Sequence, residues 1–162
     1  MNLTPKRAAE SATEMVQIVL PNDANPLGFI LGGTVMHLVD IAGAIACHRH
    51  THSLLVTAAV DGLQFLHPIK VGDMIILKSR VTATFRTSLE VEVRVYSEGT
   101  VTGLRRQTSH AYLTFVAIDA KGDPVEVPPL LLETDDERRI AAEAGVRRAE
   151  RLRARPARET VG

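Results

Sequence analysis

A predominantly apolar stretch runs from Gly32 to Cys47 and reads GGTVMHLVDIAGAIAC. It contains no proline, and its two leading glycines mark a start, so we predict one long helix from Gly32 to about His50. Asp40 is the only acidic residue in the stretch. An ionised carboxylate among small and apolar side chains loses hydration that must be replaced, which favours a partner or a chemical task. Asp40 is therefore the first candidate functional residue.

The segment before this helix is dense in turn-forming residues, and residues 21–28 read PNDANPLG. Pro26 biases Asn25 away from helical geometry, which holds its side chain on an ordered loop. Asn25 could orient a water or hydrogen-bond a carboxylate, although asparagine before proline is also a common turn former. Further upstream, residues 15–20 predict a first strand. Residues 1–11 are expected to be a loose N-terminal segment.

The residues after the helix follow the period of strands. Residues 89–96 read LEVEVRVY and alternate apolar with mostly charged side chains, which predicts an antiparallel strand with one buried and one wet face. Further strands are expected over residues 54–66, 74–81 and 106–118. Since the links are of turn length, we predict a single antiparallel meander of about five strands, with the long helix across its apolar face. The fold class is α+β.

The C-terminal region is heavily basic, with eight Arg against two Glu between residues 138 and 158. Residues 135–155 are expected to form a peripheral, solvated helix with a frayed tail. Contact with nucleic acid or a membrane is disfavoured, because the charge is local and lacks interleaved aromatic residues. The predicted organisation is one domain over residues 12–132, followed by a charged helix and tail over residues 133–162.

The overall composition narrows the function classes. The chain has 162 residues, 45% of them hydrophobic, and a formal net charge of zero, so no global basic field favours nucleic acid. Its longest apolar stretch is interrupted by Asp40, which disfavours a membrane span. The sequence shows no signal peptide and contains a single cysteine, Cys47, which fits a reducing compartment. We therefore expect a cytoplasmic protein.

The start of the helix and Asp40 could act on one carbonyl group. The backbone N–H of Gly33 is among the unpaired donors at a helix start and could stabilise negative charge on a carbonyl oxygen. Gly32 and Gly33 could equally serve only a tight turn and close packing. Asp40 could act as a general base or as a nucleophile, or could simply pair with His37.

Metal and cofactor chemistry find little support. His48, His50 and His52 have a spacing of two, which shares a face on a strand but not on a helix. Cys47 lies within the helix, where a buried thiol is usually inert. Fingerprints for dinucleotides, P-loops or serine hydrolases do not occur in the sequence. We expect no metal and no cofactor.

Several motifs occur in an order that resembles the hotdog-fold acyl-CoA thioesterases, in particular the cytosolic acyl-CoA hydrolase group. The resemblance covers about residues 14 to 132. The residues that carry it are Pro21 to Asn25, Gly28, Gly32 to Thr34, Met36, Asp40, Arg49 and His50, Val56 to Asp61, Phe65, Gly72 and Asp73, Thr87 to Val93, and Pro124 to Leu130.

The resemblance implies a long helix wrapped by a curved antiparallel sheet, and hydrolysis of acyl-CoA to a carboxylic acid and CoA. Asp40 corresponds to the catalytic acid/base or nucleophile, Asn25 to the residue that assists water, and Gly33 to the position that polarises the thioester carbonyl. Active sites in this group form between protomers, so Asn25 would serve Asp40 of a neighbouring subunit. A dimer would be the active unit of a homo-oligomer, either a tetramer or a hexamer.

The CoA part of the substrate needs its own contacts. Arg86, Thr87 and Ser88, near a turn between two strands, and Gly32 are candidates, and Arg49 could reach phosphates from the end of the helix. A non-catalytic acyl-CoA sensor is the leading alternative, with a dehydratase or a purely structural role behind it. The acyl chain length and the choice between base and nucleophile for Asp40 stay open.

Overall fold

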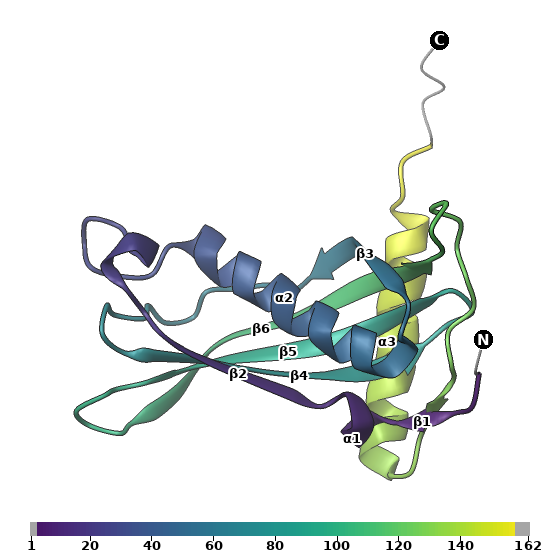
Figure 1. The fold of residues 1–162 in the computed structure, drawn as a ribbon, viewed down its shortest axis with the longest axis horizontal. Coiled ribbons are helices and arrows are strands. Elements are labelled where there is room, and N and C mark those ends of the chain that lie inside the picture. The colour runs from purple at the N-terminus through teal and green to yellow at the C-terminus, as the bar shows by residue number, and fades with distance from the viewer. Residues whose placement is uncertain (1–2, 158–162) are drawn as a thin grey trace.

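The computed structural model describes residues 3–157 and consists of one long helix lying on a curved five-stranded sheet, with a second long helix behind it (Figure 1). The N-terminal half contains β1 (Lys6–Arg7), α1 (Ala8–Ser11), β2 (Thr13–Ile18), the 3₁₀ turn η1 (Pro21–Asp23) and α2 (Gly32–Thr51). The remainder contains β3 (Leu54–Asp61), β4 (Met74–Thr84), β5 (Ser88–Glu98), β6 (Arg105–Ile118), β7 (Leu130–Leu131) and α3 (Asp135–Arg153). The predicted α+β architecture is confirmed.

The strand order in the sheet is β2-β4-β5-β6-β3, and every pairing is antiparallel. Strands β4, β5 and β6 form the predicted meander, but β2 and β3 do not pair with each other or follow in sequence order. They occupy the two opposite edges instead, because α2 separates them along the chain and crosses the sheet between them. The expected strand over residues 54–66 ends early, at Asp61, since Gly62 takes a positive φ of 68° and turns the chain.

Helix α2 packs closely on the sheet face formed by alternate residues of β5 and β6. Leu89, Val91, Val93 and Val95 of β5 are fully buried on this face. At Gly43, an added Cβ atom would lie 3.1 Å from Val91 Cγ1 and 3.2 Å from a ring carbon of Phe115. The glycine therefore permits the close approach of helix and sheet.

The opposite face of the sheet is covered as well, which corrects the prediction that the charged face of β5 is wet. Glu90 and Glu92 are only 2% and 4% exposed. Arg147 of α3 binds Glu90 through two hydrogen bonds of 2.9 and 3.0 Å, and Figure 1 shows α3 crossing behind the strands. Burial raises the pKa of Glu92, but a hydrogen bond from Arg94 and the close approach of His110 Nε2, 3.3 Å from its carboxylate, outweigh it and lower that pKa to about 2.

Helix α3 is thus docked rather than peripheral, and its own residues Ile140 and Ala144 are buried. Residues 6–11 are not loose either. Strand β1 pairs with β7, and the buried Ser11 hydroxyl accepts a hydrogen bond of 2.9 Å from the N–H of Val81. Both corrections have one cause, which is that polar side chains found buried partners far away in the sequence.

Candidate active site

Asp40 lies in the middle of α2, at the boundary between its buried and exposed faces. The side chain is half-buried; Val39 and Gly43 beside it are buried, whereas Met36 and His37 are exposed. The carboxylate does not pair with His37, the alternative partner considered from the sequence. Its Oδ1 instead accepts a hydrogen bond of 2.7 Å from the hydroxyl of Thr57.

Thr57 reaches Asp40 from β3, at an irregularity in that strand. The pairing of β3 with β6 is shifted between Thr57 and Ala59, so one extra residue, Ala58, is accommodated as in a β-bulge. Thr57 was not among the residues assigned a role from the sequence, although it lies within Val56 to Asp61, one of the motifs that carried the resemblance. A hydrogen bond across seventeen residues, from a bulged edge strand to a helix, leaves no periodic signal in the sequence.

The start of α2 presents free backbone donors. Leu31 at the N-cap position makes no side-chain capping hydrogen bond, while the N–H groups of Thr34 and Val35 both donate to the Leu31 carbonyl. Within residues 3–157, the N–H of Gly33 donates to no acceptor. The ring of Phe65 lies 3.4 Å from where a Cβ atom of Gly32 would be, so that ring borders the helix start. A carbonyl oxygen placed there would meet an uncapped, positive helix end.

Asn25 is held rigidly by its own loop. Its Oδ1 accepts hydrogen bonds of 3.0 and 3.1 Å from the N–H groups of Leu27 and Phe29, and its N–H donates to the Phe29 carbonyl. Among the described residues the Nδ2 amide group has no partner, so it remains available as a donor. No hydrogen bond links Asn25 to Asp40 within this part of the chain.

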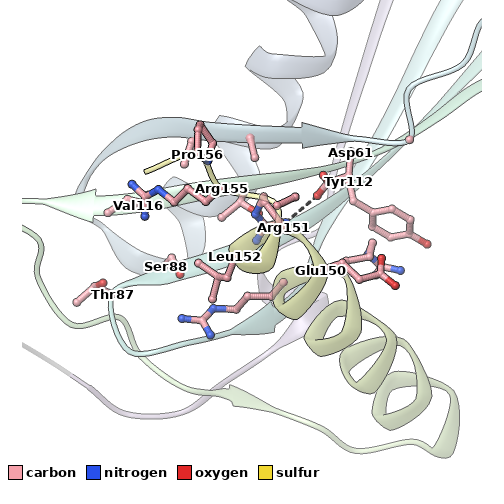
Figure 2. Close-up of a pocket in the computed structure, with 17 residues that line it drawn as sticks. Asp61, Thr87, Ser88, Tyr112, Val116, Glu150, Arg151, Leu152, Arg155 and Pro156 are labelled. Carbon is pink, nitrogen blue, oxygen red and sulfur yellow. Dashed lines mark hydrogen bonds and ion pairs between the residues drawn. The ribbon is translucent and has the colours of Figure 1, made fainter. Parts of the chain in front are cut away.

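The candidate CoA contacts separate into two groups. Thr87 and Ser88 line a cavity of about 1000 Å³ between the sheet and α3 (Figure 2). Arg86 is exposed beside them but does not line that cavity. Arg49 lies near the far end of α2 from Gly33, where its guanidinium donates to the Ala12 carbonyl and the Thr13 hydroxyl, both at 2.9 Å. The structure therefore does not bring Arg49 to the other candidates.

Two residues considered for metal or thiol chemistry, Cys47 and His50, are buried and serve the packing of the fold. Cys47 is fully buried, and burial raises the pKa of its thiol. His50 is also fully buried and bonds the Pro128 carbonyl through Nε2 at 2.7 Å. In the described part of the chain, no three His, Cys, Asp or Glu side chains gather as metal ligands. Likewise, none of its helices is long and apolar enough to cross a membrane.

Known proteins are similar to this chain both in sequence and in fold. A family model described as the thioesterase superfamily matches residues 27–104. An acyl-CoA thioester hydrolase of Bacillus subtilis, itself described as uncharacterized, is 38% identical over 128 residues, which cover 79% of this chain and 74% of that protein. The chain belongs to the acyl-CoA hydrolases of the thioesterase superfamily. Its long helix on a curved antiparallel sheet is the hotdog fold.

Solved structures of acyl-CoA hydrolases align closely. An apo-hexameric acyl-CoA thioesterase is 38% identical, with a TM-score of 0.87 over 93% of this chain and 96% of its own. The Staphylococcus aureus acyl-CoA hydrolase, solved with butyryl coenzyme A, coenzyme A and coenzyme A disulfide, is 32% identical, with a TM-score of 0.82 over 92% and 93% of the two chains. Variants of it with an aspartate, an asparagine or a threonine changed to alanine align similarly.

The family also contains longer members. The rat cytosolic acyl coenzyme A thioester hydrolase is 33% identical over 141 residues, or 86% of this chain. These residues cover 37% of the rat protein, so this chain spans little more than a third of its length.

Proposed function

We propose that this protein hydrolyses acyl-CoA thioesters to a free carboxylic acid and CoA, with Asp40 as the reacting carboxylate. The observation that carries the proposal is the position of Asp40 on α2. Its carboxylate accepts a hydrogen bond from Thr57 of β3, and the uncapped start of the same helix offers the N–H of Gly33. Membership of the acyl-CoA hydrolases supports the same substrate class.

Thr57 orients the reacting carboxylate in this scheme. Its hydroxyl donates a hydrogen bond to Oδ1 of Asp40, which leaves Oδ2 to take a proton from water or to attack the thioester carbonyl. As the tetrahedral intermediate forms, negative charge develops on the carbonyl oxygen, and the N–H of Gly33 would donate to it. Collapse of the intermediate expels the CoA thiolate. On the base route, Asp40 returns to this thiolate the proton that it took from water, and the free acid is released. On the nucleophile route, collapse leaves an acyl anhydride of Asp40, and water then hydrolyses it to the free acid and the Asp40 carboxylate. No cofactor enters the scheme.

Asn25 would position the attacking water by its free Nδ2 group. Since it makes no hydrogen bond to Asp40 within the described part of this chain, we propose that it serves Asp40 of a second subunit. Edge strand β3 is consistent with such a partner, because Leu54, Val56 and Val60 are 56%, 45% and 44% exposed on it. A dimer would then be the smallest active unit, within a tetramer or a hexamer.

The spacing of these residues supports their grouping. In the S. aureus hydrolase, the replaced asparagine, aspartate and threonine follow one another at intervals of 15 and 17 positions. Asn25, Asp40 and Thr57 follow one another at the same intervals here. The CoA contacts proposed are Gly32, Thr87 and Ser88, with Arg86 beside them; Arg49 stays a prediction that its hydrogen bonds to Ala12 and Thr13 do not favour.

The test is free-thiol release from a panel of acyl-CoAs, from acetyl to palmitoyl, by wild type and the Asp40→Asn variant. Asparagine keeps the size of the side chain but can act neither as base nor as carboxylate nucleophile. We expect turnover by wild type and a loss of at least about 1000-fold in the variant, with its assembly unchanged. Binding of acyl-CoA without thiol release on any chain length would contradict the proposal and indicate a sensor.

A further inference from the structure

Strand β3 presents Thr57 and Asp61 to opposite faces of the sheet. In the pairing of β3 with β6, Thr57 lies opposite Phe115 and Asp61 lies opposite Tyr112. Directly opposite residues of an antiparallel pair project to the same face. The ring of Phe115 packs under α2, whereas the ring of Tyr112 lies 3.6 Å from a guanidinium carbon of α3. Thr57 therefore faces α2, and Asp61 faces α3.

The bulge in β3 makes this arrangement possible. Thr57 and Asp61 are four positions apart, and in a regular strand such residues project to the same face. The extra residue, Ala58, shifts the alternation by one, because the pairing with β6 is displaced between Thr57 and Ala59. Thr57 can therefore bond Asp40 of α2 while Asp61 bonds α3 on the other side of the sheet.

Two consecutive turns of α3 bind neighbouring strands on that side. Arg147 donates hydrogen bonds of 2.9 and 3.0 Å to Glu90 of β5, and Arg151 donates one of 2.8 Å to Asp61 (Figure 2). Side chains four positions apart share one face of a helix, so both arginines point to the sheet. The Arg151 and Asp61 side chains are 25% and 31% exposed, so salt screens their ion pair only in part. Helix α3 thereby ties the end of β3 to the centre of the sheet.

The bulge is held by side chains at both of its ends. Within residues 3–157, the bonds of Thr57 to Asp40 and of Asp61 to Arg151 are the only side-chain hydrogen bonds of β3. The strand lies at an edge of the sheet, and Gly62 turns the chain directly after Asp61. A slip of one residue moves a side chain to the other face. Without the contact at Asp61, the bulge could relax, and the Thr57 hydroxyl would point to Asp40 for a smaller part of the time.

We propose that Arg151 is a positioning residue for acyl-CoA hydrolysis. Through its ion pair with Asp61 it fixes the bulge of β3, and the bulge holds the Thr57 hydroxyl towards Asp40. The inference rests on the proposed function, because it gives α3 a part in orienting the reacting carboxylate. Arg151 contacts the face of the sheet, so it leaves the edge of β3 free for the second subunit.

Double-mutant cycles on thiol release test the inference. We expect Arg151→Gln and Asp61→Asn each to lower kcat roughly 3- to 10-fold at unchanged KM, and the double variant to lose no more than either single variant. In a Thr57→Val background, Arg151→Gln should have no further effect, because its route to Asp40 is already interrupted. Arg151→Lys keeps the charge and should retain more of kcat than Arg151→Gln.

The matched control is Arg139→Gln, because Arg139 also forms ion pairs, but with Asp136 and Glu143 of its own helix. This variant should leave kcat and KM unchanged. The inference is overturned if Arg151→Gln raises KM instead of lowering kcat, or if it leaves kcat unchanged. It is also overturned if Arg151→Gln costs as much in the Thr57→Val background as in wild type, or if Thr57→Val itself keeps the wild-type kcat.

Hydrogen exchange separates this inference from the proposed function. If wild type releases thiol from no acyl-CoA, the proposed function fails, and the inference then concerns only the bulge. The amides of residues 54–61 should exchange at least about 5-fold faster in Arg151→Gln than in wild type or Arg139→Gln, while the amides of β5 keep their rates. Equal exchange of residues 54–61 in the three proteins would overturn the inference.

Discussion

The hydroxyl of Thr57 on β3 donates a hydrogen bond of 2.7 Å to Oδ1 of Asp40 on α2. This contact joins the edge strand of the sheet to the middle of the long helix. It fixes one oxygen of the carboxylate and leaves the other without a partner in the described residues.

Replacing Thr57 by valine keeps the shape of the side chain but removes this donor. A hydrogen bond to a charged group contributes roughly 1.5–3 kcal/mol, so we expect kcat for acyl-CoA hydrolysis to fall about 10- to 100-fold. Thr57→Ser retains the hydroxyl and should keep most of the activity. An unchanged kcat in the valine variant would show that the contact does not orient the reacting group.

The proposed sharing of one site between two subunits predicts complementation. Asn25→Ala and Asp40→Asn should each abolish activity alone. In a mixed dimer purified through two different tags, one site combines an intact Asn25 with an intact Asp40, so we expect about half of the wild-type rate. A mixed dimer that stays as inactive as its parents would place both residues in one subunit's site.

The role of the Gly33 N–H can be tested by a substitution that removes this one hydrogen-bond donor from the backbone. Proline is tolerated in the first turn of a helix, so Gly33→Pro removes the donor while α2 can still form. We expect thiol release to fall about 100- to 1000-fold, with the circular dichroism spectrum unchanged. Gly33→Ala is the control, since nothing lies within 4 Å of an added Cβ atom and the N–H remains. Equal rates of the two variants would contradict the role.

His50 makes stability depend on pH. Burial lowers its pKa from the ordinary value near 6.5, although its bond to the Pro128 carbonyl opposes the shift. Below about pH 6.5 the unfolded chain therefore binds the proton first, and the stabilisation present at higher pH is lost as the pH falls towards the folded-state pKa. Urea midpoints at pH 7.5 and 5.5 should differ more for wild type than for His50→Gln. A larger difference in the variant would contradict this assignment.

Local patterns were sufficient for some elements and not for others. The alternation around Leu89 and the proline-free run around Asp40 predicted β5 and α2, because each depends on periodic burial along one segment. The placement of β2 and β3 at opposite edges of the sheet was not predicted, because the local sequence of a strand does not determine which strand it pairs with. The docking of α3 was missed for a related reason, as Arg147 meets Glu90 across 57 residues.

The candidate site divides in the same way. Asp40, Asn25 and Gly33 could be selected from the sequence by residue type, loop chemistry and position at a helix start. Thr57 could not, because its role depends on a bulge that turns one hydroxyl towards a helix. Arg49 had the right chemistry for phosphate, but Ala12 and Thr13 occupy its guanidinium.

Gly43 lies one helical turn after Asp40, on the side of α2 that faces Val91 and Phe115. An added Cβ atom would lie 3.1 Å from Val91 and 3.2 Å from Phe115, so a methyl group there would require these side chains or the helix to shift by a few tenths of an ångström. A side chain larger than alanine would push the helix away from the sheet and so move Asp40 away from Thr57 on β3. The position of the carboxylate therefore depends partly on the absence of a side chain one helical turn away, and a large substitution at Gly43 should lower activity without removing any of the proposed catalytic groups.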